Sequence, residues 1–272
     1  AGIEAVLGKP RARAVMDHYG VTTEGNFEGR NILHAAQPAP EAVEALYAAR
    51  RRRPPPLRDE KILTAWNGLM ISAHARAALV LGEERYAAIA ARAAGFVLAK
   101  MRPQGRLRRS YRDGTARHNA YLEDYAFLTA GLLDLFEATG EPRWLREAIE
   151  LDMVLEKHYE DAAGGGWFRT SDDHESLPAR EKPSQDGAEP SGGSVAVLNL
   201  LRLHELTTRD RYRDRAERAL RAYAGKLEAA PLALSEMLLA VDFQLDTAKQ
   251  IVIVTPGWRA QADPLLARLR RA

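Results

Sequence analysis

The feature that most constrains the fold is a plan that occurs three times along the chain. Each copy has an apolar helical segment, a short turn in which an arginine precedes an aromatic residue, and a second helical segment richer in charge. From Arg85 to Arg143 is 58 residues, and from Arg143 to Arg211 is 68 residues. These spacings exceed the roughly 34 to 47 residues of common helical solenoid repeats, because a long connection follows each second helix.

The two helices of each copy differ in how much apolar surface they carry. The first is apolar on nearly every side, as the segments around Leu63, Leu132 and Leu198 show, so we expect it to be buried nearly all round. The second has one apolar stripe and many arginines and glutamates, which is typical of an outer layer; these helices are expected at 85–101, 143–159 and 211–227. The pattern predicts an all-α fold, a partial α/α toroid in which inner and outer helices alternate, with a fourth inner helix at 231–245.

The connections and the end of the chain carry the only extended stretches that we expect. Residues 107–111 and 164–170 read as short β-hairpins at the rim of the toroid. Residues 250–254 are a β-branched run, and a helical segment follows at 263–271. We therefore expect a toroid domain at 1–246 and the start of a small α/β element at 247–272.

Charge and composition exclude several classes of partner and cofactor. The chain has 39 Lys and Arg against 37 Asp and Glu, a net charge of +2, so we expect neither nucleic acid nor a membrane surface as a partner. It has no cysteine, and its seven histidines are dispersed without metal-ligand spacing, so we expect no metal and no cofactor. Nothing reads as a cleavable signal or an apolar span, which favours a cytoplasmic location.

Polar residues gather where the three inner helices are expected to begin. In a toroid these ends converge on a central funnel, a concave site with apolar walls and a few fixed polar groups. The helix-capping alternative remains open for Asp59, Asp186 and Ser191. A structural hydrogen bond between helices is the alternative for Asn67. The candidates at the three starts are Asp59, Lys61, Trp66 and Asn67; Tyr121, Glu123, Asp124 and Tyr125; and Asp186 and Ser191.

Carboxylates and aromatic rings give this set two possible chemistries. Two carboxylates that face each other at roughly 5 to 9.5 Å serve as acid and base in glycoside chemistry. The candidates are Asp59, Glu123, Asp124 and Asp186. Trp66, Tyr121 and Tyr125 suit stacking on a sugar ring, and they suit ordinary core packing equally well.

Eight short stretches together resemble one family. They are GNFEG (25–29), NILH (31–34), DEKILT (59–64), WNGLM (66–70), SYRDG (110–114), YLEDYAFL (121–128), DGA (186–188) and PSGGSV (190–195). In this order they are similar to the thioredoxin-domain-containing family of YyaL and spermatogenesis-associated protein 20. One departure is Gly193, which stands where that family usually has asparagine.

The resemblance implies a six-hairpin toroid, similar to six-hairpin glycosidases and sugar epimerases, whose N-terminal thioredoxin-like domain is absent from this chain. The expected function is binding or processing of a carbohydrate-like small molecule in the funnel. The alternative is a non-catalytic module that docks a protein client or the thioredoxin-like domain. Because a toroid without its first hairpins leaves apolar faces uncovered, the chain is also expected to self-associate.

Overall fold

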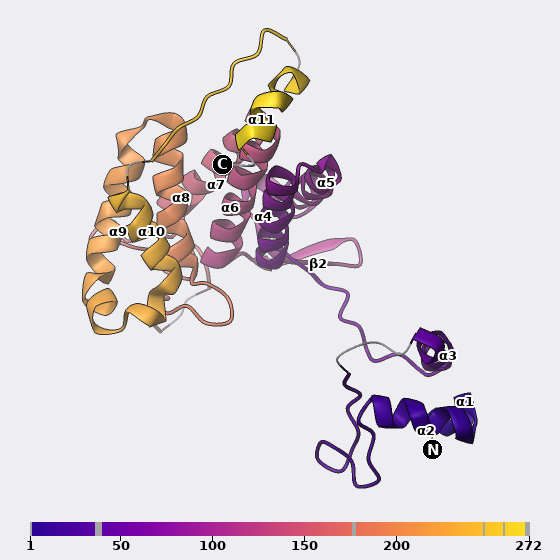
Figure 1. The fold of residues 1–272 in the computed structure, drawn as a ribbon. Helices are drawn as coiled ribbons and strands as arrows, with labels where there is room; N and C mark the ends of the chain where they lie inside the picture. The colour runs from indigo at the N-terminus through magenta and orange to yellow at the C-terminus, as the bar shows by residue number, and fades with distance from the viewer. Residues whose placement is uncertain (1, 36–39, 176–177, 247, 258, 270–272) are drawn as a thin grey trace. The chain divides into compact units, whose positions relative to one another are not determined.

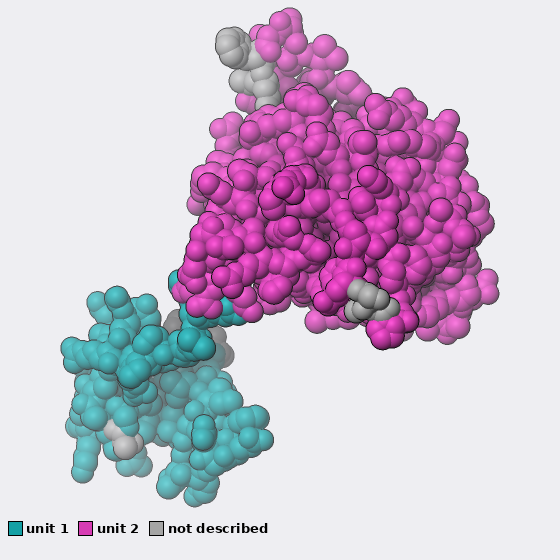
Figure 2. Space-filling model, turned by 180° about the vertical axis from the view of Figure 1, so that it is seen from behind, with its two compact units in different colours: residues 1–59 teal, residues 60–272 magenta. Residues whose placement is uncertain are grey.

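The computed structural model describes residues 2–35, 40–175, 178–246, 248–257 and 259–269. The chain divides into two compact units, residues 1–59 and residues 60–272 (Figure 2). The domain boundary expected between 246 and 247 stays a prediction, and residues 247, 258 and 270–272 of the expected C-terminal element lie outside the described residues.

The described part of the first unit contains three helices and a loop that the side chains of Asn26 and Asn31 hold together. The helices are α1 (Gly2–Leu7), α2 (Lys9–His18) and α3 (Pro40–Arg51). The Asn26 side chain donates to the carbonyl oxygens of Gly20 and Ile32, both at 2.8 Å, and accepts the Ile32 N–H at 2.8 Å. The amide thus replaces the regular backbone hydrogen bonds that the loop lacks.

The second unit confirms the alternating helices (Figure 1). Each observed start lies within a few residues of the start expected from the sequence. The inner helices are α4 (Thr64–Leu81), α6 (Leu122–Thr139), α8 (Gly192–Thr207) and α10 (Ser235–Leu245), and the outer helices are α5 (Glu84–Lys100), α7 (Pro142–His158) and α9 (Asp210–Ala229). Short 3₁₀ turns occur at η1 (Pro103–Gly105), η2 (Pro231–Leu234) and η3 (Arg259–Ala262).

The repeated Arg-aromatic turn has a packing role. Trp144 and Tyr212 are buried at the starts of α7 and α9. In each copy the arginine lies over the ring of its own neighbour, with Arg143 3.7 Å above the Trp144 ring and Arg211 4.8 Å above the Tyr212 ring. In the second and third copies the buried ring anchors the outer helix in the core, and in each copy the guanidinium lies over the ring.

Two glycines let the first inner helices approach closely. A Cβ atom added to Gly68 of α4 would lie 2.5 Å from the Phe127 carbonyl carbon of α6. A Cβ atom added to Gly131 of α6 would lie 2.7 Å from the Gly68 carbonyl oxygen. The backbones therefore touch directly, and α6 is buried along most of its length at the centre of the core.

One of the two expected rim hairpins forms. Strands β2 (Arg108–Arg112) and β3 (Thr115–Asn119) pair antiparallel, and β1 (Ile62–Leu63) pairs with β2 through Leu63 and Ser110. Residues 164–170 contain no strand, only a single bridge from Glu160 to Trp167. The hairpin expected there was wrong beyond this bridge: the Phe168 N–H still donates to the Tyr159 carbonyl at 2.8 Å, but the residues before Tyr159 belong to α7 (Pro142–His158) and cannot form a partner strand.

The end of the chain also differs from expectation. Residues 250–254 are described and form no strand, although helix α11 (Asp263–Leu269) follows. A β-branched run needs a partner strand for its backbone hydrogen bonds, and none of the described residues supplies one. Among the described residues, none of the helices is both long and apolar enough to cross a membrane.

Candidate functional site

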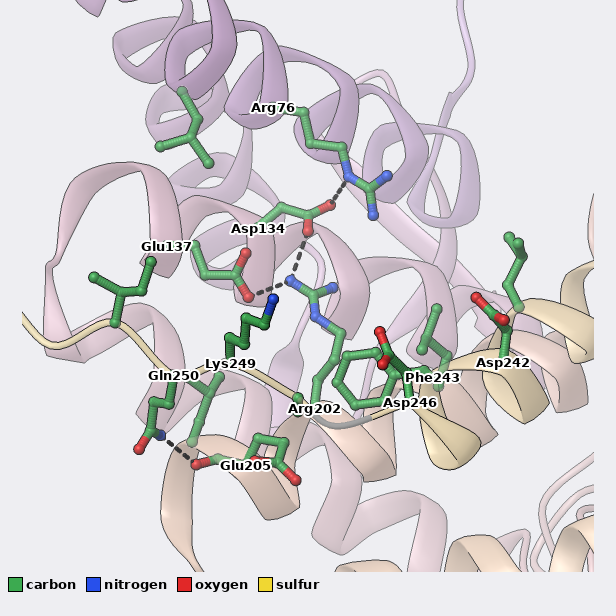
Figure 3. A pocket seen from close by; sticks show the side chains of 16 residues that line it. Arg76, Asp134, Glu137, Arg202, Glu205, Asp242, Phe243, Asp246, Lys249 and Gln250 are labelled. Atoms are coloured by element: carbon green, nitrogen blue, oxygen red, sulfur yellow. Dashed lines mark hydrogen bonds and ion pairs between the residues drawn. The ribbon is translucent and has the colours of Figure 1, made fainter. Parts of the chain in front are cut away.

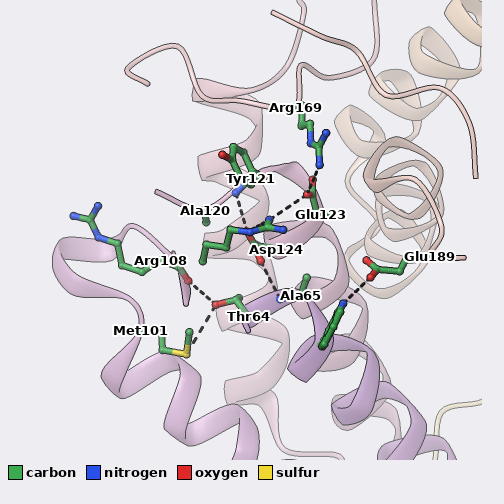
Figure 4. Close-up of polar contacts among 12 residues, drawn as sticks. Thr64, Ala65, Met101, Arg108, Ala120, Tyr121, Glu123, Asp124, Arg169 and Glu189 are labelled. Carbon is green, nitrogen blue, oxygen red and sulfur yellow. Dashed lines mark hydrogen bonds and ion pairs between the residues drawn. The ribbon is translucent and has the colours of Figure 1, made fainter. Parts of the chain in front are cut away.

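Asp124 ties the starts of the first two inner helices together (Figure 4). Its Oδ1 accepts the Ala65 N–H of α4 at 2.9 Å, and its Oδ2 accepts the Tyr121 N–H at the start of α6 at 2.9 Å. Helix starts leave N–H groups without intrahelical partners, and the negative charge of a carboxylate there also interacts favourably with the helix dipole. The single side chain of the fully buried Asp124 therefore accepts hydrogen bonds from backbone N–H groups at the starts of two helices.

Asp186 repeats this arrangement for the next two inner helices. Its Oδ1 accepts the Ser191 N–H at 2.7 Å and the Ser194 hydroxyl at 3.0 Å, both at the start of α8. Its Oδ2 accepts the Glu236 N–H of α10 at 2.8 Å. Ser191 caps α8 itself, since its Oγ accepts the Ser194 N–H at 3.1 Å. The capping alternative therefore describes Ser191, and Asp186 acts as a shared cap for two helices.

The two ties lie next to each other. A Cβ atom added to Gly192, the first residue of α8, would be 2.7 Å from Leu122 Cγ and 3.0 Å from the Glu123 N of α6. The starts of all four inner helices therefore form one continuous rim, defined here as the helix starts tied by Asp124 and Asp186 with the side chains around them. A larger residue at 192 would force the Leu122 side chain or the start of α6 to shift.

Glu123 is a carboxylate of this rim that contacts two arginines. It is largely buried, and its Oε1 accepts from Arg109 Nη1 of β2 at 3.2 Å and from Arg169 Nη2 at 3.4 Å. The same two guanidinium groups lie over the Tyr121 ring, at 4.7 and 5.6 Å from its centroid. The His174 ring also stacks on Tyr121, with the two ring centroids 5.7 Å apart. Charge and aromatic surface are thus held together by several elements.

Trp66 stands at the same rim with much of its ring in solvent. The residue is 56% exposed, and its indole N–H donates to Glu189 Oε1 at 2.6 Å (Figure 4). Glu189 precedes α8, so this bond spans from the first inner helix to the third. The Asn67 amide donates to the Leu63 carbonyl at 2.8 Å, which is a bond within its own helix start. The hydrogen bond from Trp66 to Glu189 fixes the plane of the indole ring.

Burial changes the acid–base behaviour of Asp124. Desolvation raises its pKa to about 6, against the lowering effects of the Tyr121 N–H and of Arg109. Burial and the neighbouring Asp186 also raise the pKa of Glu236. Asp124 is thus a carboxyl group that titrates above its usual range, but both of its oxygens are occupied by backbone N–H groups.

The structure brings together seven of the ten predicted residues: Trp66, Asn67, Tyr121, Glu123, Asp124, Asp186 and Ser191. Tyr125 lies in the core instead, where its hydroxyl accepts the Leu107 N–H at 2.9 Å. Lys61 is exposed, and Asp59 belongs to the first unit, not to the unit that carries the rim.

Three rim residues were not expected from the sequence: Arg109, Arg169 and Glu189. Arg109 lies next to the SYRDG stretch, but arginine is common throughout this chain and nothing distinguishes it. Arg169 and Glu189 lie in connections without periodic pattern. Their partners are 46 and 123 residues away in the sequence, so only the packing of the helices reveals them.

Comparison with known proteins supports both the family and the fold. No family model matches the chain. Human spermatogenesis-associated protein 20 is 38% identical over 92% of this chain, and the rat protein of that name is 38% identical over 88%. The chain spans 37% and 35% of the lengths of these relatives, which is about a third of each.

Solved structures with the same fold include sugar-processing enzymes. Cellobiose 2-epimerase from Spirochaeta thermophila matches 60% of this chain with a TM-score of 0.50 and 19% identity, and the match covers 43% of that enzyme. The cellobiose 2-epimerase from Bacillus thermoamylovorans matches 61% with a TM-score of 0.52 and 14% identity, covering 45% of it. A family 105 glycoside hydrolase from C. acetobutylicum matches 68% with a TM-score of 0.51 and 15% identity, covering 58% of it. At these identities the likeness establishes the α/α-toroid fold.

Proposed function

Because this chain belongs to the spermatogenesis-associated protein 20 family over the segment that it spans, and has the fold of sugar-processing toroids, we propose that its rim binds a carbohydrate-like small molecule. The observation that carries the proposal is Trp66, a half-exposed indole ring fixed by Glu189 beside the Glu123 cluster. A shared fold alone does not establish a shared function, so the proposal depends on this local arrangement.

The rim offers the two kinds of contact that a sugar needs. The exposed face of Trp66 provides an apolar plane for the C–H groups of a pyranose ring. Arg109 and Arg169 provide N–H donors, and Glu123 and Glu189 provide acceptors for hydroxyl groups. A few polar groups at fixed positions around an apolar surface are typical of small-molecule sites.

Of the three expected acid–base carboxylates that lie at the rim, Glu123 is the one that this proposal retains. Asp124 and Asp186 spend both of their oxygens on the backbone N–H groups of helix starts. Glu123 uses only Oε1, and its Oε2 has no hydrogen-bond partner among the described residues. Glu123 is therefore the carboxylate that we propose for proton transfer to or from a bound sugar.

Titration of the protein with cellobiose and mannose, followed by NMR and calorimetry, tests the binding site. We expect Trp66→Ala to weaken binding by about tenfold, equivalent to about 1.4 kcal/mol, whereas Trp66→Phe keeps part of the affinity because an aromatic plane remains. The matched control is Met70→Ala, which removes a similarly exposed side chain one turn further along α4. Equal affinity for Trp66→Ala and wild type, or no sugar binding at all, would refute the proposal.

A second function, docking of another protein, is favoured by one specific observation. Helix α4 carries apolar side chains at 66, 70, 73, 77 and 80, which form one stripe along the helix, and Met70 and Val80 are 55% and 67% exposed. We propose as its occupant another helix, from a second copy of this chain, from a protein client or from the thioredoxin-like domain of a longer polypeptide.

Light scattering distinguishes this second function from sugar binding. If α4 associates with a second copy, the protein forms dimers that Val80→Glu dissociates, since a buried charge without a partner is costly. Ala88→Glu is the control, because Ala88 is exposed on the outer helix α5. A monomer that binds neither a thioredoxin-like domain nor a client leaves the docking function without support.

A further inference from the structure

The inner helices also enclose a pocket that the rim does not include (Figure 3). Its volume is about 830 Å³, and its lining comes from α4, α6, α8 and α10 together with Asp246 and residues 248–251. No residue of the outer helices α5, α7 and α9 contributes to it. On α6, Asp134 of this pocket comes ten residues after Asp124 of the rim, which places the two roughly 15 Å apart along the helix axis.

The floor of the pocket is a charge network centred on the buried Asp134 and the largely buried Arg202. Asp134 is 4% exposed and accepts hydrogen bonds from the Ser72 hydroxyl, from Arg76 Nε at 3.1 Å and from Arg202 Nη2 at 2.7 Å. Arg202 Nη2 also donates to Glu137 Oε1 at 2.8 Å. One carboxylate therefore positions two guanidinium groups, which lowers the entropy that a ligand would lose in ordering them.

Arg202 keeps donors for a ligand. Burial lowers its pKa, but Asp134 and Glu137 more than compensate and raise it, so the group stays charged. Its Nε and Nη1 have no hydrogen-bond partner among the described residues. Arg76 uses only Nε in this network and is more exposed. These N–H groups are preorganised donors at the floor of a concave site.

The charges of the whole lining restrict the ligand. Five lining residues are carboxylates, namely Asp134, Glu137, Glu205, Asp242 and Asp246, and three are cations, namely Arg76, Arg202 and Lys249. The excess of carboxylates disfavours a polyanion such as a sugar phosphate. A strongly cationic ligand would meet the two guanidinium groups at the floor. A purely apolar ligand would strip water from Arg202 without replacing its hydrogen bonds.

A neutral ligand with many hydroxyl groups meets none of these penalties. Each hydroxyl both donates and accepts, so it can bond to Arg202 and to Glu137 or Glu205 at once. The walls add apolar surface from Leu198, Leu239 and other side chains, and an aromatic ring from Phe243. The volume lies within the roughly 300 to 1,000 Å³ of small-molecule sites.

We propose that this pocket is a second binding site, which takes a neutral polyhydroxyl molecule of monosaccharide to disaccharide size on the donors of Arg202. The site goes beyond the proposed function at the rim and does not depend on it, because the two share no residue of those described.

The test uses the full chain with methyl-labelled leucines and three sugar probes. Methyl β-glucoside is neutral, glucuronate is anionic and glucosamine is cationic. We expect the neutral probe to shift the methyl signals of Leu198, Leu206 and Leu239, which line the pocket, and to bind at least about fivefold more tightly than either charged probe.

Two matched variants locate the site. Leu239→Trp fills the pocket from a side chain that is 54% exposed, so it is expected to fold and to weaken binding by about tenfold. Leu245→Trp makes the same change on the same helix, at an 81% exposed residue outside the lining, and is expected to bind like wild type. Trp66→Ala, which tests the rim, is expected to leave these leucine shifts unchanged.

Several results would overturn the proposal. They are an absence of leucine shifts with any of the three probes, tighter binding of a charged probe, unchanged binding in Leu239→Trp, and loss of the leucine shifts in Trp66→Ala. The last result would assign the sugar to the rim. Conversely, pocket binding that survives while Trp66→Ala has no effect on any sugar would reject the rim and retain the pocket.

Discussion

Replacing Asp186 by asparagine separates a structural role from a catalytic one. The substitution keeps the shape of the side chain but turns one oxygen into an NH₂ group. Both oxygens of Asp186 accept backbone N–H groups, from Ser191 and from Glu236. In the asparagine variant one of these N–H groups must therefore face the side-chain NH₂ group, and both groups are donors. No rotation of the amide avoids this conflict.

The size of the effect follows from these contacts. Losing one hydrogen bond to a charged acceptor costs about 1.5 to 3 kcal/mol. Removing the negative charge from the starts of α8 and α10 adds roughly 0.3 to 1 kcal/mol per helix. We expect Asp186→Asn to lower the free energy of unfolding by about 2 to 5 kcal/mol, equivalent to a fall in Tm of roughly 4 to 20 °C for a unit of this size.

Urea and thermal unfolding measure this change, and Glu189→Gln is the matched control. Glu189 lies in the same connection and is exposed, and glutamine retains an oxygen that can accept the Trp66 N–H, so we expect a change below about 0.5 kcal/mol. An unchanged Tm in Asp186→Asn, together with loss of a measured sugar-processing activity, would refute the structural role and restore Asp186 as a catalytic candidate.

Two further predictions concern the packing and the pH dependence of the same unit. Gly68→Ala places a Cβ atom 2.5 Å from the Phe127 carbonyl carbon and should lower the free energy of unfolding by about 1 to 3 kcal/mol. Gly95→Ala on α5, where the added Cβ meets no neighbouring atom within 4 Å, should raise it by about 0.5 to 1 kcal/mol. Urea unfolding of both variants measures the difference, and equal effects would contradict the close approach of α4 and α6. Because burial raises the pKa of Asp124 to about 6, the folded protein keeps a proton on this carboxyl group between about pH 4 and pH 6 that the unfolded chain has already lost. The contribution of Asp124 to the free energy of unfolding therefore falls by up to about 3 kcal/mol as pH rises from about 4 to about 6. Carboxyl ¹³C NMR measures this pKa, and a value near 4 would contradict the prediction.

The sequence by itself determined the repeating helices and their layers. Apolar residues recur at helical spacing on every side of the inner segments and on one side of the outer segments, and this difference depends only on neighbours three or four residues apart. The Arg-aromatic turns, with buried Trp144 and Tyr212, fixed where the second and third outer helices begin. The sequence also located the polar starts of the inner helices, including Glu123 and Asp186.

Only the tertiary structure decided what those polar residues do. Asp124 accepts an N–H from a residue 59 positions away, and Trp66 reaches a residue 123 positions away, because the inner helices pack side by side. The same packing buried Tyr125 and Trp167, and it created the pocket around Arg202. Helical periodicity is a local property and can be read from the chain, whereas hydrogen-bond partners depend on which helix faces join, and that is settled by long-range packing.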